Sequence, residues 1–250
     1  MRRIFRFFLR AILGVLIGVT LYEAIMFVRV YRLRSNNPSS TSLIDIRANE
    51  AKEKGQQVRR EQVWVPLDKI STNLQRAILA GEDTNFTTHR GFDYEAIRNA
   101  WEQAQKETAR EAKQEGEDDD WLPSLPEFKR GGSTISQQLA KNLYLSSQRS
   151  MLRKGQEAAL TVMLERSLTK RRILEIYLNV IEWGDGVYGA EAASRRYFRK
   201  PASALNANEA AFLSAMIPNP RTVFNPQINP RRVARRQRII MRGMPYVRLP

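Results

Sequence analysis

The sequence has no cysteine and a single histidine, His89, among its 250 residues. The absence of cysteine excludes disulfide-stabilised folds, thiolate metal sites and catalytic thiols. One histidine excludes a zinc site with several histidine ligands and leaves little room for a Ser-His-Asp triad. Any catalytic chemistry must therefore depend on carboxylates and cationic side chains.

Negative charge is also scarce, because 26 acidic residues face 41 lysines and arginines and the net charge is +15. Such a balance indicates an anionic partner, and nucleic acid, anionic lipid headgroups and phosphorylated substrates all qualify. No zinc-finger, RNA-recognition or basic-zipper signature accompanies the C-terminal arginines, so nucleic acid is not the expected partner. Lipid headgroups or water are expected to meet Arg231, Arg232, Arg235, Arg236, Arg238, Arg242 and Arg248.

One long hydrophobic run, at residues 11–28, lies between four arginines that precede it and three that follow. As a helix this run would rise about 27 Å, just enough to cross the hydrocarbon of a bilayer. The flanking charges lean toward a cytoplasmic N-terminus. A cleaved signal peptide is the alternative. No A-x-A-like site follows the run and arginines do, which favours an uncleaved anchor with the rest of the chain outside the cytoplasm.

The chain divides into four parts by composition. An N-terminus with its anchor (1–34) is followed by a turn-rich juxtamembrane linker (35–62), a main domain (63–225) and a basic C-terminal helix (226–250). Apolar periodicity, capping residues and prolines predict the helices. They are expected at 72–82, 93–116, 134–144, 150–168, 169–181, after Gly189 to near Phe198, at 206–217 and at 230–243. The fold class is therefore mostly α, with a short extended piece at 63–66 and a mobile acidic insert at about 103–130.

The helix expected at 150–168 is apolar on most sides, as a central helix would be, and carries an interrupting polar ridge. Arg153, Lys154 and Glu157 share one of its faces. Charges on a buried helix must be paired or must bind something charged, so a structural salt bridge and an anion site are both possible. Lys141 and Arg149 lie nearby in the chain. Four cations on two helices that meet at a short turn could converge on a pyrophosphate.

Glu82 and Asp83 stand at the C-terminal end of the helix expected at 72–82. Plain solvation is one interpretation of an adjacent acidic pair. The other is a general base or acid held beside a cleft. His89, a few residues later, is expected to have a local structural role.

These segments together resemble the peptidoglycan glycosyltransferases, the lysozyme-like glycosyltransferase family 51 that polymerises lipid II. The run from Glu82 through Phe86, His89 and Gly91 resembles the first family motif, E-D-x-x-F-x-x-H-x-G. Four further segments resemble the other motifs in family order: 131–142 (GGSTISQQLAKN), 153–157 (RKGQE), 170–179 (KRRILEIYLN) and 189–198 (GAEAASRRYF). Because no transpeptidase domain follows up to Pro250, the resemblance is to the monofunctional members.

The resemblance implies a lysozyme-like helical domain and a role for each matching residue. Glu82 would be the general base and Glu157 the second essential carboxylate, which orients cations or assists the leaving group. Lys141, Arg149, Arg153 and Lys154 would bind the pyrophosphate. The residues that would line the substrate cleft are Asp83, Phe86, His89, Ser133, Thr134, Gln137, Gln138 and Asn142.

The resemblance also implies partners and a location. The reaction would join lipid II to the growing lipid-linked glycan by a β-1,4 bond, with inversion at the donor C1 and release of undecaprenyl pyrophosphate. No organic cofactor is expected, but a divalent cation, Mg or Mn, could assist that release. Membrane lipids, other cell wall synthases and division proteins are the expected neighbours, at a bacterial inner membrane with the domain in the periplasm. A lytic enzyme on the same fold and a non-catalytic basic scaffold remain as alternatives.

Overall fold

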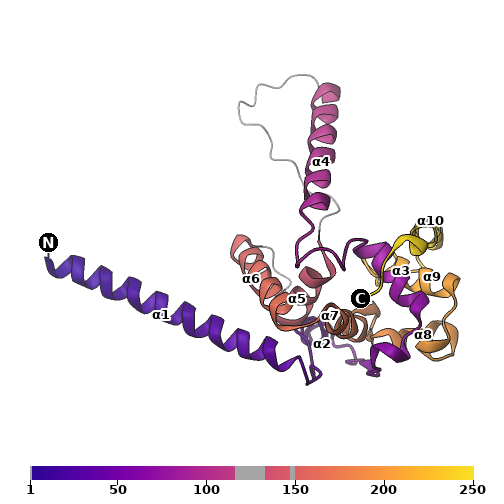
Figure 1. The fold of residues 1–250 in the computed structure, drawn as a ribbon, viewed down its shortest axis with the longest axis horizontal. Coiled ribbons are helices and arrows are strands. Elements are labelled where there is room, and N and C mark those ends of the chain that lie inside the picture. Colours follow the sequence, from indigo (N-terminus) through magenta and orange to yellow (C-terminus); the bar gives the residue numbers. More distant parts are fainter. Residues whose placement is uncertain (1, 116–132, 147–149) are drawn as a thin grey trace.

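The computed structural model describes residues 2–115, 133–146 and 150–250. It consists of a helical domain from which two helices project, α1 (Arg2–Arg32) on one side and α4 (Tyr94–Glu115) on another (Figure 1). The mostly α class with an apolar N-terminal helix is therefore confirmed. Among the described residues, α1 is the helix long and apolar enough to cross a membrane.

The remaining helices begin and end within two residues of the predicted ranges, apart from α2, which was not predicted. Their bounds are α2 (Ser42–Glu53), α3 (Thr72–Glu82), α5 (Ile135–Tyr144), α6 (Met151–Ser167), α7 (Lys170–Val180), α8 (Ala190–Phe198), α9 (Ala207–Met216) and α10 (Pro230–Gly243). Capping side chains explain the agreement at the starts of α3, α5, α6, α7 and α9, because each satisfies an amide that the first turn leaves free. Thr134, for example, forms the predicted capping box with Gln137 at the start of α5.

The core is built around α7, in which seven of the eleven residues are buried. The expectation that the helix at 150–168 would be central is wrong, since Val162 of α6 is 39% exposed. Asn179, fully buried near the end of α7, donates to the carbonyl oxygen of Val65 and accepts from its amide, both at 2.9 Å. One buried amide side chain therefore fixes the extended segment 63–66 against the core without a partner strand.

A small sheet, absent from the sequence predictions, closes the side of the domain next to α8. Its order is β1 (Glu61–Gln62), β3 (Val187–Tyr188), β2 (Glu182–Gly184), with β1 parallel and β2 antiparallel to β3. Strands of two or three residues contain too few alternating positions to produce a period-two pattern, so the sequence carries no signal for them. The sheet places Glu182 on the wall of the groove described below.

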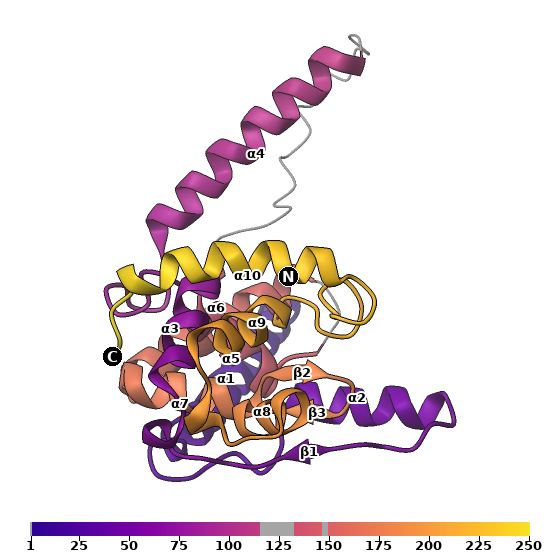
Figure 2. The ribbon, with the colours of Figure 1, turned by 90° about the vertical axis from the view of Figure 1, so that its right-hand side faces the viewer.

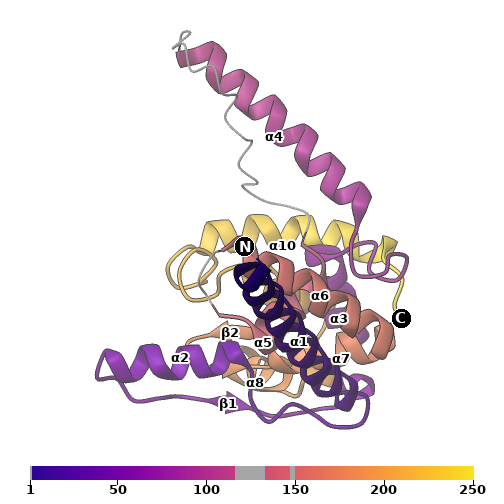
Figure 3. The same cartoon turned by 90° about the vertical axis from the view of Figure 1, so that its left-hand side faces the viewer.

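The anchor helix is part of the domain and not only a tether. The last turns of α1 pack against α6 (Figure 3), where Met26, Val30 and Leu33 are buried. Arg172 of α7 donates to the carbonyl oxygens of Leu33 and Asn36, at 2.8 and 3.1 Å. The exit of the chain from α1 is thereby held at two backbone positions.

Two predicted boundaries need correction. Residues 42–53 were placed in a linker, but they form α2, which is capped by Thr41 and packs against α5. The basic C-terminal helix was placed outside the main domain, but α10 lies across α3 and α9 (Figure 2) and buries Val233 and Ile240. Of the predicted insert at 103–130, residues 103–115 belong to α4, and 116–130 lie outside the described residues.

The seating of α1 can be tested with a matched pair of valines two residues apart on the same helix. Val30 is fully buried against the domain, whereas Val28 is 55% exposed. We expect Val30→Ala to lower the free energy of unfolding of the detergent-solubilised protein by about 1–2 kcal/mol, because it leaves a cavity. Val28→Ala should change it by less than about 0.5 kcal/mol. Equal thermal stability of the two variants would show that α1 is only a tether.

Candidate active site

A groove runs along α5 and consists of three neighbouring cavities. The cationic cavity, of about 370 Å³, lies between α5, α6 and α2. The Glu82 cavity, of about 390 Å³, continues from it toward α7 and the loop 217–221, and both are lined by Ser133, Gln138, Lys141 and Asn142. A side cavity of about 190 Å³ shares Glu82 and Ser133 with the second. Ser133 therefore stands where all three meet.

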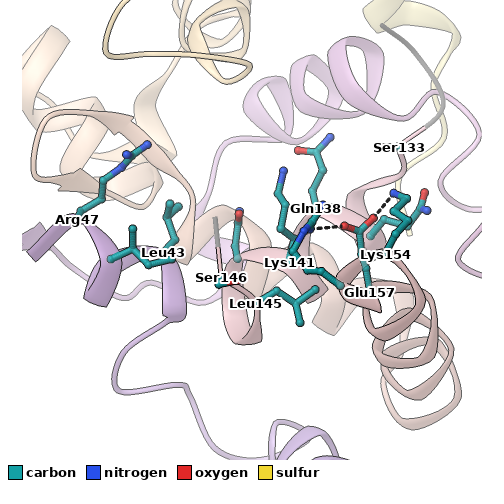
Figure 4. Close-up of a pocket in the computed structure, with 13 residues that line it drawn as sticks. Leu43, Arg47, Ser133, Gln138, Lys141, Leu145, Ser146, Lys154 and Glu157 are labelled. Carbon is teal, nitrogen blue, oxygen red and sulfur yellow. Dashed lines mark hydrogen bonds and ion pairs between the residues drawn. The ribbon is translucent and has the colours of Figure 1, made fainter. Parts of the chain in front are cut away.

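The cationic cavity is lined by four cations and one carboxylate (Figure 4). The cations are Arg47, Lys141, Arg153 and Lys154, and the carboxylate is Glu157. Arg47 is already paired with Glu50 and Glu182, at 3.0 and 3.1 Å. The excess positive charge of the cavity therefore comes from α5 and α6, which is an arrangement suited to an anion with several oxygen atoms.

Glu157 is buried on α6 and is held by two cations from the preceding turn. Arg153 donates to one carboxylate oxygen at 3.1 Å and Lys154 donates to the other. The spacing of four and three residues brings both cations over the same carboxylate. The structural salt bridge that the sequence left open is therefore present, but Lys154 remains 53% exposed beside the cavity. Glu157 thus holds Arg153, which is largely buried, and Lys154, which stays open to the cavity.

Lys141 has no ion pair within 4 Å among the residues that the structure describes. It reaches solvent along the groove, but the walls displace part of its hydration shell. This desolvation, with repulsion from Arg153 and Lys154, lowers the pKa of Lys141 against the attraction of Glu157 and Glu82. Lys141 lines both main cavities and is the cation that connects them.

Glu82, the last residue of α3, lines the Glu82 cavity and the side cavity. Its carboxylate accepts from the guanidinium of Arg236 at 2.7 Å and from the amide of Gln138 at 2.9 Å. Side chains of α3, α5 and α10 thus meet at one carboxylate. Gly81, which precedes Glu82, lets α3 pack closely on α9, because a Cβ there would lie 2.7 Å from the hydroxyl of Ser214.

Burial raises the pKa of Glu82 above its ordinary value, against the lowering effects of Arg236, Gln138 and Lys141. The side chain is only 9% exposed, so loss of hydration is the dominant cause. A partly buried carboxyl with a raised pKa, on the wall of a cavity, is the usual form of a general acid or base.

Asp83 points away from Glu82 and supports the fold. Its carboxylate accepts from the amide of Ile135 at 2.9 Å and pairs with His89 at the same distance. Ile135 is the first residue of α5, and a carboxylate there is favoured by the helix dipole. His89 in turn accepts from the amide of Gly91. The local structural role expected for His89 is therefore what the structure shows.

The structure separates the predicted cleft residues into two groups. Phe86 is fully buried under Lys170, and neither it nor His89 lines any of the three cavities, so their placement in the cleft is wrong. Asp83, Thr134 and Gln137 line the groove with polar atoms that are largely occupied by their own hydrogen bonds. Ser133, Gln138 and Asn142 line both main cavities. Arg149 lies outside the described residues.

Two participants were missed. Arg236 was counted among arginines expected to meet lipid or water, and Tyr177, whose hydroxyl donates to Gln138 at 2.8 Å, was not considered. Arg236 is 154 positions from Glu82 in the chain, so no spacing rule could connect them. One local signal existed: Arg236 follows Val233 by three residues and precedes Ile240 by four, so it lies on the buried side of a strongly basic helix.

The described residues of the groove do not form a site for a resident metal ion. In the described ranges, no three carboxylate, histidine or cysteine side chains come together as metal ligands. The single carboxylate of the cationic cavity is already neutralised by Arg153 and Lys154. The chemistry of the groove is therefore derived below from side chains alone.

The chain is similar in sequence to proteins of a known family. The transglycosylase family model matches residues 49–116 and 122–245. The biosynthetic peptidoglycan transglycosylase of Laribacter hongkongensis is 43% identical over 245 residues, which is 98% of this chain and 99% of the relative. Those of Chromobacterium violaceum and Thiobacillus denitrificans are 46% and 42% identical, over 92% and 100% of both chains. The matched residues include all described groove residues except Leu43, Ile46 and Arg47 of α2, and the chain belongs to the transglycosylase family.

Proposed function

We propose that the protein polymerises lipid II into peptidoglycan strands, with Glu82 as the general base and the cationic cavity as the binding site of the departing pyrophosphate. The observation that carries this proposal is the continuity of the Glu82 and cationic cavities through Lys141. A base on one side and excess positive charge on the other are what transfer from a sugar diphosphate requires. The names of the relatives supply the substrate class.

The base step uses the ionised form of Glu82. Its carboxylate removes the proton from the 4-hydroxyl of the acceptor's N-acetylglucosamine. The oxygen then attacks C1 of the donor's N-acetylmuramic acid from the face opposite the diphosphate, which inverts the configuration and forms a β-1,4 bond. The C1–O bond to undecaprenyl pyrophosphate breaks, and its electron pair leaves with the diphosphate.

The leaving group needs neutralisation of charge more than a proton, because a diphosphate is already a stable anion. Lys141, Arg153 and Lys154 would supply it, and Glu157 would keep the last two aimed into the cavity. Glu157 then acts by positioning these cations and not as an acid, since both of its oxygens accept from them.

A lipid-linked substrate requires an enzyme at the bilayer surface. The apolar helix α1 would hold the domain there, and we propose a single pass through a bacterial inner membrane with the domain in the periplasm. Because α1 packs against α6, which carries Arg153 and Lys154, the anchor also fixes the cationic cavity relative to the membrane.

Glycan cleavage on the same fold is the second candidate. It needs an acid carboxyl, and the raised pKa of Glu82 would suit that role, but it needs no cationic cavity. Purified protein incubated with lipid II alone, and separately with finished glycan strands, distinguishes the two. Polymer from lipid II supports the proposal, whereas shortened strands with no polymer would refute it.

Glu82→Gln should lower the rate of lipid II polymerisation by at least about a hundredfold, because an amide cannot accept the proton. The substitution keeps the shape of the side chain, so thermal stability and attachment to membranes should change little. Glu53→Gln, an exposed residue at the end of α2, is the matched control. A Glu82→Gln protein with the rate of the unmodified protein would remove the base assignment.

The pH dependence follows from the same carboxyl. The base must be ionised, and burial raises its pKa, so activity should rise with pH through a value above the ordinary range of glutamate. Activity is lost as pH falls through that value. Initial rates measured across the acidic range, with folding followed by circular dichroism, test this. An acidic limb at or below the ordinary glutamate range contradicts the assignment.

Lys154→Ala should reduce kcat and kcat/KM together, roughly ten- to a hundredfold, because charge develops on the diphosphate mainly as the bond breaks. Lys69→Ala removes an exposed lysine outside the groove and serves as the control. A full titration with donor separates binding from catalysis. Unchanged parameters for Lys154→Ala would exclude this side chain from leaving-group stabilisation.

A further inference from the structure

The amide of Gln138 stands between a carboxylate and a hydroxyl. Its nitrogen donates to one oxygen of Glu82 at 2.9 Å, and its oxygen accepts from the hydroxyl of Tyr177 at 2.8 Å. The three side chains come from α3, α5 and α7, so this chain of two hydrogen bonds exists only in the folded protein.

The two ends of this amide have almost the same shape but opposite hydrogen-bonding character. An ionised Glu82 can only accept, so it is compatible with the nitrogen end of Gln138 and is repelled by the oxygen end. The other end must then find a donor. Tyr177 is that donor, and it is fully buried. Burial and the nearby carboxylates of Glu82 and Asp83 raise its pKa well above the ordinary value, so its proton is always present.

We propose that Tyr177 is a positioning residue of the reaction: its hydroxyl holds the Gln138 amide with the nitrogen toward Glu82 and thereby keeps the base ionised. The inference rests on the proposed function, in which Glu82 is the general base. Tyr177 acts through Gln138, because its hydroxyl has no contact with Glu82 of its own among the hydrogen bonds of the described residues.

The charged groups around Glu82 do not replace the hydrogen bond that the Gln138 amide donates to it. Arg236 from α10 pairs with one oxygen of Glu82, and Lys141 from α5 attracts it from the groove. Asp83, next in the chain, is turned toward His89 and the start of α5. With Arg236 on one oxygen, Gln138 is the hydrogen-bond donor to the other. A rotated amide would present its oxygen there and favour the protonated carboxyl.

The test is Tyr177→Phe, which keeps the ring and removes the hydroxyl. The acidic limb of the pH–rate profile should move upward by about one pH unit, with most of the rate recovered at higher pH. Tyr197→Phe is the matched control. The hydroxyl of Tyr197 also donates a hydrogen bond, to the backbone carbonyl of Trp183 at 2.9 Å, but Tyr197 lines none of the three cavities. Its acidic limb should coincide with that of the unmodified protein.

A double substitution separates positioning from general loosening of the core. In a Gln138→Met background no amide remains to be oriented, so adding Tyr177→Phe should cause no further shift of the limb. A Tyr177→Phe limb that coincides with the unmodified one overturns the inference, whether or not the rate falls uniformly. A further shift in the Gln138→Met background overturns it as well.

A measurement independent of turnover covers the case of an inactive variant. The protonation of Glu82 can be followed by infrared difference spectroscopy of its carboxyl band, identified by its loss in Glu82→Gln. Tyr177→Phe should raise the midpoint of this titration, and an unchanged midpoint contradicts the inference. If Glu82→Gln were fully active, the proposed function would fail. If it were inactive and Tyr177→Phe left the midpoint unchanged, only the role of Tyr177 would fail.

Discussion

The groove is organised around one buried carboxyl, Glu82, whose charged form is disfavoured by burial and favoured by two hydrogen-bond donors. Glu82 is 9% exposed at the end of α3, where loss of hydration favours its neutral form. Arg236 and Gln138 oppose that preference with two hydrogen bonds. Neither would be in place without the packing of α10 on α3 and of α5 on α7, so much of the domain serves to hold two donors against one side chain.

Glu157 and Glu82 are both buried, yet their surroundings give them different chemistry. Glu157 is neutralised by cations three and four residues before it on the same helix. Its pairing is local, and it directs two cations into the cationic cavity. Glu82 is bound by donors from other helices, and none of the described residues near it in the chain pairs with it. Glu157, with its local partners, fits a positioning role. Glu82, whose pKa burial raises and whose donors lower it, fits proton transfer.

The anchor and the groove form one mechanical unit. The buried end of α1 packs on α6, and Arg172 fixes the backbone just after it. Since α6 also carries Arg153 and Lys154, the position of the cationic cavity relative to α1 is set by direct packing and not by a linker. Under the proposed function, with α1 in the bilayer, a lipid-linked diphosphate would therefore be met at a constant height above the hydrocarbon.

The sequence by itself determined the elements whose causes are local. The helices capped by Ser71, Thr134 and Asn206, the apolar length of α1, and the pairing of Glu157 with its neighbours all follow from residues within a few positions of one another. The resemblance of five ordered segments also indicates Glu82 and Lys141 as site residues, and both line the groove.

Only the tertiary structure decided which side chains meet across the chain. Two hydrogen bonds join residues far apart in sequence: Arg236 donates to Glu82, and Tyr177 donates to Gln138. The burial of Phe86 away from the groove depends on which surface the rest of the chain covers. Periodicity reports that a face is apolar but not what packs against it. The physical reason is that desolvation and long-range hydrogen bonds are properties of the packed core, and no local segment contains them.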